Sequence, residues 1–144
     1  MKIFLDTSAL VKLYHTEKYS EALESFLTVN TIEAVYLSDL AKVEFASAIF
    51  KKLRLKALQE SEALAVLNFF SEDSKNFRFV QLNDSIVAKA HYFIEKYGKQ
   101  GLRSLDAIQL ASMISIEQEL DYVISFDDLL NSICDLEALK LQNF

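Results

Sequence analysis

Short apolar runs, separated by much longer helical patterns, restrict the fold of this chain more than any other feature. The runs lie at residues 3–5, 34–37, 77–82 and 122–126, and a further one lies at 139–141. Between them, apolar residues recur every three or four positions, as in an amphipathic helix, at 10–14, 19–27, 39–54, 58–70, 86–97, 102–119 and 129–133. Strands that alternate with helices predict an α/β fold, in which helices cover both faces of a central parallel sheet. We expect a three-layer sandwich with four or five strands.

The composition favours one domain and limits its partners. A chain of 144 residues that is 51% hydrophobic can bury a single core, so we expect one domain over residues 1–144. Its 21 acidic and 15 basic residues give a net charge of -6, which opposes non-specific binding to nucleic acid. Bound cations can reverse this field locally.

The sequence also predicts where the protein acts. The opening apolar run is interrupted at Asp6, well before it reaches the length of a signal peptide. No other run approaches the roughly 20 apolar residues of a membrane span. Cys134 is the only cysteine, which fits a reducing compartment. We therefore expect a cytoplasmic protein that does not interact with membranes.

Two acids directly follow predicted strands. Asp6 comes after residues 3–5, and Asp127 comes after residues 122–126. The carboxyl ends of parallel strands lie at one edge of a sheet, where ligands bind in open α/β folds. Capping is the alternative for Asp6, because Asp, Thr and Ser all cap helices. At the second position, the neighbouring Asp128 is an alternative inward-facing acid.

Two more acids lie within apolar helical patterns. Glu44 stands in the helix predicted over residues 39–54, most of which should be buried. Asp106 lies in a first helical turn, on a face that continues through Leu110 and Met113. The alternatives are an exposed edge for Glu44 and stabilisation of the helix dipole by Asp106.

Four converging carboxylates would repel one another unless protons or cations intervene. Mg²⁺ and Mn²⁺ prefer oxygen ligands and often link a few carboxylates to a phosphate. The set Asp6, Glu44, Asp106 and Asp127 therefore predicts a site for Mg²⁺ or Mn²⁺. Thr7 or Ser8 could hold a metal-bound water.

The order of these motifs resembles the PIN-domain ribonucleases, and more closely the VapC-type toxins of prokaryotic toxin–antitoxin systems. The similarity rests on Phe4-Leu5-Asp6-Thr7-Ser8, an isolated Glu44, Leu105-Asp106-Ala107-Ile108-Gln109-Leu110-Ala111 and Ser125-Phe126-Asp127. Ser125 stands where the family often has threonine, and it keeps the hydroxyl group. The resemblance implies that the four acids are catalytic metal ligands, supported by Thr7, Ser8 and Ser125.

The same resemblance implies an activity and partners. The activity is Mg²⁺-dependent endoribonuclease cleavage, which leaves a 5′-phosphate and a 3′-hydroxyl. The implied partners are an RNA substrate, a cognate VapB-type antitoxin and a second copy of the chain in a homodimer. Candidate RNA-binding residues are Lys51, Lys52, Arg54 and Arg103. An ordinary solvated surface is an equally good explanation for Lys52 and Arg54.

Two other functions fit part of the pattern. A haloacid-dehalogenase-type phosphatase also begins with an apolar strand that ends in Asp, but it needs a second Asp two positions later, where this chain has Ser8. A catalytically silent PIN module would bind RNA or protein without cleavage. The presence of all four acids favours the enzyme.

Overall fold

The computed structural model describes residues 1–144 and contains a parallel four-stranded sheet with the order β3-β2-β1-β4. The strands are β1 (Lys2–Leu5), β2 (Ala34–Ser38), β3 (Arg78–Val80) and β4 (Tyr122–Ile124). The central strand β1 pairs with β2 through Ile3 and Val35, and with β4 through Phe4 and Val123. The predicted parallel sheet is therefore confirmed, with β1 between the strands that come second and last in the chain.

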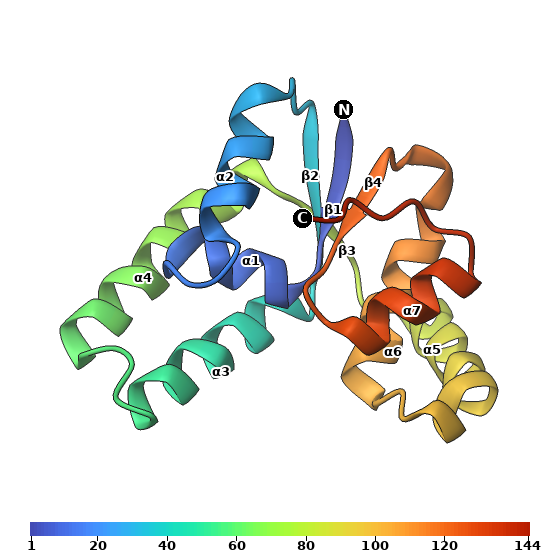
Figure 1. Ribbon diagram of the computed structural model, residues 1–144. Coiled ribbons are helices and arrows are strands. Elements are labelled where there is room, and N and C mark those ends of the chain that lie inside the picture. The colour runs from blue at the N-terminus through green and yellow to red at the C-terminus, as the bar shows by residue number, and fades with distance from the viewer.

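Helices cover both faces of the sheet, which confirms the predicted three layers (Figure 1). One face carries α1 (Thr7–Tyr14), α2 (Ser20–Val29), α3 (Ala41–Arg54) and α4 (Glu60–Asp73). The other carries α5 (Asp84–Tyr97), α6 (Ser104–Ser115) and α7 (Asp128–Leu136). Short 3-10 helices follow α4, α5 and α6, at η1 (Ser74–Asn76), η2 (Gly98–Gln100) and η3 (Glu117–Glu119). None of the helices is long and apolar enough to cross a membrane.

Side-chain alternation along β1 divides the apolar interior into two cores. Ile3 and Leu5 point to the α1–α4 face, where they join a cluster that includes Phe45. Phe4 points to the opposite face and joins a cluster that includes Leu110 and Ile133. Since β1 is covered on both faces, all three of these residues are fully buried, as expected for a central parallel strand.

Helix α3 corrects the expectation that residues 39–54 are mostly buried. Only Ala41, Phe45 and Ile49 are buried, at a spacing of four residues along one stripe. Val43 and Phe50 keep 69% and 44% of their surface exposed. The physical reason is that α3 packs on α1, α4 and β2 on one side, where Ala48 and Leu53 are partly buried next to this stripe. Its other sides border the cleft described below or solvent.

The structure leaves four strands of the four or five expected, and it corrects one helix boundary. The apolar run at residues 139–141 forms only an isolated bridge between Leu141 and Val123, because the chain exchanges hydrogen bonds with β4 around a single residue. The helix predicted to continue to residue 119 ends at Ser115 and is followed by η3. There the Ser115 hydroxyl donates to the Ser112 carbonyl (2.7 Å), a local bond that competes with continued helix.

Candidate active site

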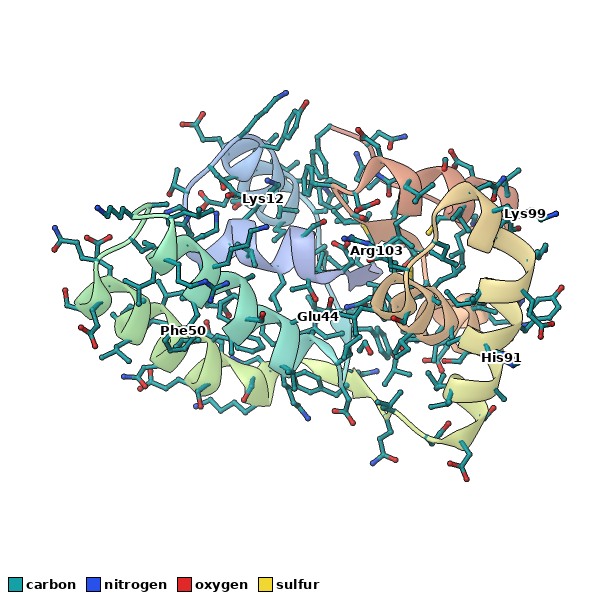
Figure 2. The ribbon with its side chains drawn as sticks, turned by 90° about the horizontal axis from the view of Figure 1, so that it is seen from below. Lys12, Glu44, Phe50, His91, Lys99 and Arg103 are labelled. Carbon is teal, nitrogen blue, oxygen red and sulfur yellow. The ribbon has the colours of Figure 1, made fainter.

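A cleft of about 830 Å³ lies at the carboxyl ends of β1 and β4, and all four predicted acids line it. Asp6 and Asp127 reach it from the ends of the two strands, whereas Glu44 and Asp106 reach it from α3 and α6. Figure 2 shows Glu44 on α3 and Arg103, just before α6, on two sides of this region. The structure thus brings together four carboxylates that are separated by up to 121 residues in the chain.

Asp6 is the most deeply buried of these acids, with 4% of its surface exposed. One carboxylate oxygen, Oδ1, accepts hydrogen bonds from the Ser8 hydroxyl (2.7 Å) and from the Ala9 backbone N–H (2.9 Å), and so caps α1. The other oxygen, Oδ2, accepts from Ser125 (2.8 Å). Burial outweighs these bonds and raises the pKa of Asp6 to about 6, and the negative charge of Asp127 adds to the rise. Capping and a place in the cleft are therefore compatible.

Asp127 caps α7 and is linked to Asp6 through one hydroxyl. Its Oδ1 accepts a hydrogen bond from the Leu130 N–H (2.8 Å), while its own N–H donates to the Ser125 hydroxyl (3.1 Å). Ser125 in turn donates to Asp6, so this hydroxyl links the Asp6 carboxylate to the backbone of Asp127. The neighbouring Asp128 is exposed and does not line the cleft. Of the two adjacent acids, Asp127 is the one that faces it.

Glu44 is only partly buried and belongs to a small polar network. Its Oε1 accepts hydrogen bonds from the Thr7 hydroxyl (2.9 Å) and from the Gln109 amide (2.7 Å). The same amide also donates to the Thr7 hydroxyl (3.0 Å). Burial raises the pKa of Glu44, although the bonds from Gln109 and Thr7 oppose the rise, and the charge of Asp106 adds to it. Glu44 is thus a held carboxylate rather than a free surface acid.

Asp106 lies in the first turn of α6 and forms an ion pair with Arg103, whose Nε donates to Oδ2 over 3.0 Å. The side chain of Arg103 is 76% exposed and that of Asp106 only 17%. Asp106 therefore lines the cleft, and its charge is partly balanced by an exposed surface cation.

Ser8 connects the ends of the two strands that carry the acids. Its hydroxyl donates to Asp6 and accepts a hydrogen bond from the Phe126 backbone N–H (2.8 Å). Thr7 and Ser8, which the sequence suggested as holders of a metal-bound water, thus contact the carboxylates Glu44 and Asp6 directly. This makes each of them an orienting group for one acid.

Three of the four candidate RNA-binding residues line the cleft: Lys51, Arg54 and Arg103. Lys52 does not line the cleft, and its ammonium binds Glu17 (2.6 Å). The structure adds cleft residues that the sequence interpretation missed: Lys12, Glu17 and Gln109. Gln109 lies three positions after Asp106 within an apolar helical run, and that polar interruption was the available signal.

A divalent cation fits the donors of this cleft in kind and in charge. No three acidic, histidine or cysteine side chains in the chain lie close enough together to form a ready metal cluster. The donors are nevertheless all oxygens, and burial with neighbouring negative charge disfavours ionisation of Asp6 and Glu44. The Oε1 atom of Gln109 is buried here without a hydrogen-bond partner. A hard cation that keeps several waters suits such a set.

Comparison with known proteins agrees with the resemblance seen in the sequence. A family model described as "PIN domain" matches residues 3–136. Ribonuclease VapC47 of Mycobacterium tuberculosis (strain CDC 1551 / Oshkosh) is 28% identical over 134 residues, which cover 92% of this chain and 89% of that protein.

Solved structures share the fold at low identity. The VapC20 toxin of Mycobacterium tuberculosis, described as cleaving the sarcin–ricin loop, superposes with a TM-score of 0.71 at 15% identity over 91% of this chain and 94% of that one. The FitAcB structure from Neisseria gonorrhoeae gives a TM-score of 0.71 at 19% identity over 98% and 96%. VapBC2 of Rickettsia felis, bound to a DNA fragment from its promoter, gives 0.67 at 12% identity over 100% and 99%. With a family model matched over nearly its whole length, the chain belongs to the PIN domain family.

Proposed function

We propose that this protein is a metal-dependent endoribonuclease and the toxin of a VapBC-type toxin–antitoxin pair. The observation that carries the proposal is the convergence of Asp6, Glu44, Asp106 and Asp127 in one cleft, from four separate parts of the chain. Ribonuclease VapC47, which is 28% identical over nearly the full length, supports RNA as the substrate. The toxins among the structural neighbours support the biological setting.

In this proposal the four acids hold one or two Mg²⁺ or Mn²⁺ ions, with Asp6 and Asp106 as principal ligands. The ion, when bound, supplies a Lewis acid for the phosphate and lowers the pKa of water. The hydroxyls of Ser8 and Ser125 fix the carboxylate of Asp6, because each donates to a different oxygen. Thr7 and Gln109 hold the carboxylate of Glu44, both by donating to its Oε1. Groups that hold ligands in this way set the orientation of the site before substrate binds.

Cleavage of RNA by purified protein tests the proposal. Total RNA and a sarcin–ricin loop hairpin serve as substrates, with Mg²⁺ or Mn²⁺ in one arm and EDTA in the other. We expect metal-dependent products with a 5′-phosphate and a 3′-hydroxyl. Asp6→Asn and Asp106→Asn should lower the rate by 10²-fold or more, on the order of the loss of an important metal ligand.

The adjacent acids provide a matched control. Asp127→Asn should reduce the rate, whereas Asp128→Asn should not, because Asp128 is exposed and lies outside the cleft. Wild-type cleavage by Asp6→Asn would refute the assignment. Binding of RNA without metal-dependent cleavage would instead identify a catalytically silent PIN module, the second candidate function.

The proposed partners are a cognate antitoxin and a second copy of the chain. Structures of VapBC and FitAB complexes among the neighbours support the antitoxin. Coexpression with the product of a short adjacent reading frame should give a stable complex in which cleavage is inhibited. Light scattering of the isolated protein should give twice the 16.4 kDa mass of one chain. A monomer would remove the homodimer from the proposal.

A further inference from the structure

Lys12 is a buried cation in the candidate active-site cleft. The proposed roles of the four carboxylates do not account for its presence there. Only 9% of its surface is exposed, yet it lines the cleft. It lies on α1, one helical turn beyond Ser8, a rise of about 6 Å along the axis. Ser8 contacts Asp6, so Lys12 stands on the same face of α1 as the hydroxyl that holds this acid. Figure 2 labels Lys12 among the N-terminal helices.

The ammonium of Lys12 has two fixed neighbours. Its Nζ donates to Glu17 Oε1 over 2.6 Å, and it lies 4.8 Å from the ring centroid of Phe126. Phe126 is the residue between Ser125 and Asp127. The ring therefore places the Lys12 ammonium beside the segment 125–127, which includes Asp127 and the serine that binds Asp6. Cation–π attraction and the ion pair both restrict the position of the ammonium.

The turn between α1 and α2 holds Glu17 in place. The Glu17 backbone N–H donates to the Ser20 hydroxyl (3.0 Å), and that hydroxyl donates to the carbonyl of Lys12 (2.9 Å). Ser20 is 1% exposed, so these bonds are shielded from water. The backbone of Glu17, the residue that binds the ammonium, is thus anchored through Ser20 to the backbone of Lys12. Such an arrangement presents the ammonium in one geometry.

The group formed by Lys12, Glu17 and Lys52 is positive even though the protein as a whole is acidic. The Glu17 carboxylate binds Lys12 through Oε1 and Lys52 through Oε2, each over 2.6 Å. These bonds outweigh burial and lower the pKa of Glu17, so it is ionised at neutral pH. Two ammonium groups share one carboxylate, which leaves a net charge of +1. Of the two, only Lys12 lines the cleft.

We propose that Lys12 binds a backbone phosphate of RNA in the part of this cleft that lies next to Asp6 and Asp127. In this proposal, Glu17 is a positioning residue for the Lys12 ammonium. The inference rests on the proposed function, because it takes RNA as the ligand. An ammonium has three N–H donors, and Glu17 uses one of them. Its other N–H groups make no further hydrogen bond within the protein, and Lys12 lines the cleft in which an anion would bind. Charge-assisted hydrogen bonds of this kind are the usual way in which proteins hold phosphate groups.

Salt-dependent RNA binding tests the role of Lys12 separately from cleavage. Fluorescence anisotropy with a labelled single-stranded RNA, measured in EDTA at several salt concentrations, reports phosphate contacts without turnover. We expect Lys12→Met to weaken binding about tenfold and to reduce the slope of log K against log salt by about 0.7 to 1. Lys12→Arg, which retains a cation, should restore the slope.

Two variants distinguish phosphate binding from a purely structural role. Glu17→Gln breaks the same ion pair as Lys12→Met but keeps the lysine charge, so it should retain the salt slope while cleavage slows. Lys42→Met is the matched control. Lys42 also makes a 2.6 Å ion pair, with Asp39, and also lies over an aromatic ring, Phe79 at 4.1 Å, but it is outside the cleft. Its loss should leave the slope unchanged.

The outcomes separate this inference from the nuclease assignment. A wild-type slope in Lys12→Met, or equal loss of slope in Lys12→Met and Glu17→Gln, overturns the phosphate site. Absence of RNA binding by the wild-type protein overturns it as well. A Lys12-dependent slope in a protein that does not cleave RNA supports the site and refutes the nuclease. Circular dichroism checks folding, and Lys12→Gln, which can still donate to Glu17, replaces Lys12→Met should that variant not fold.

Discussion

Asp6 carries a cost of burial that a bound cation would relieve. Its ordinary pKa of 3.8 rises to about 6 in the folded protein, chiefly because the carboxylate is removed from water. Since the folded state favours the protonated form, Asp6 stabilises the protein most below pH 4. That contribution is lost as pH rises through about 6. The change amounts to on the order of 2–3 kcal/mol.

Asp6→Asn should therefore be more stable than the wild-type protein at pH 7.5 in EDTA. The neutral amide avoids the cost of a buried charge and still accepts from the Ala9 N–H. Thermal unfolding should show a melting temperature several degrees higher at pH 7.5, and a difference that shrinks at pH 4.5. A variant that is less stable than wild type at both pH values would contradict this account.

Gln109 should matter for activity more than for stability. Gln109→Met removes the amide that donates to Glu44 and Thr7, and it also removes the buried unpartnered Oε1. We expect cleavage to fall by about 10- to 100-fold, a typical effect of losing a group that orients a ligand. Gln118→Met is the control, because Gln118 also donates to a glutamate but is exposed. Equal rates for the two variants would count against the role of Gln109.

The sequence located the four acids because each stands out against an apolar pattern. Asp6 and Asp127 end apolar runs, and Glu44 and Asp106 interrupt apolar helices. The sequence pattern did not show whether Asp127 or Asp128 faces the cleft, because strand alternation stops at the residue before them. The burial of Lys12 was not predictable from the sequence, since a lysine in an amphipathic helix is ordinarily at the surface. Its partner Glu17 lies in the following turn.

At the scale of elements, α3 shows that an apolar helix is not necessarily a buried one. Phe45 is fully buried against Tyr14 and Phe70, whereas Phe50 is 44% exposed. Phe45→Ala should reduce the free energy of unfolding by about 3–5 kcal/mol, and Phe50→Ala by about 1 kcal/mol or less. Urea unfolding measures both. Similar losses would show that the outer side of α3 is covered in solution.

The pattern predicted most elements correctly because strand and helix periods differ. It overestimated α3 burial because burial depends on which neighbours a helix has, and no local spacing encodes that. It left open a fifth strand at residues 139–141, where the chain pairs with β4 at only one position. The type of each element was thus predictable from the sequence, whereas its length and its burial depend on tertiary contacts.

For the whole molecule, divalent cations should raise stability. Binding to the folded state alone stabilises it by mass action, and the acids of the cleft lie far apart in an unfolded chain. With Mg²⁺ or Mn²⁺ at constant ionic strength, the melting temperature of the wild-type protein should increase with metal concentration. Asp6→Asn should lose most of this increase, and Asp128→Asn should keep it. An equal response in all three proteins would indicate general screening of the net charge of -6.

The parallel sheet was predictable from strands separated by helices, but its order was not. Several orders satisfy right-handed connections between parallel strands. The structure places β1 in the middle, between β2 and β4, and this order gathers Asp6 and Asp127 at adjacent strand ends. The sequence predicted that Asp6 and Asp127 lie at the same edge of the sheet. Only the folded structure shows that their strands are neighbours.

The hydrogen bonds from Ser125 to Asp6, and from the Asp6 N–H to the Ile124 carbonyl, join residues that lie 118 or 119 positions apart. During synthesis, Asp6 leaves the ribosome long before its partners exist. The cleft therefore remains incomplete in the growing chain until β4 and the start of α7 have emerged. Under the proposed function, the chain is unable to cleave RNA around its own ribosome until these segments have emerged and folded onto β1.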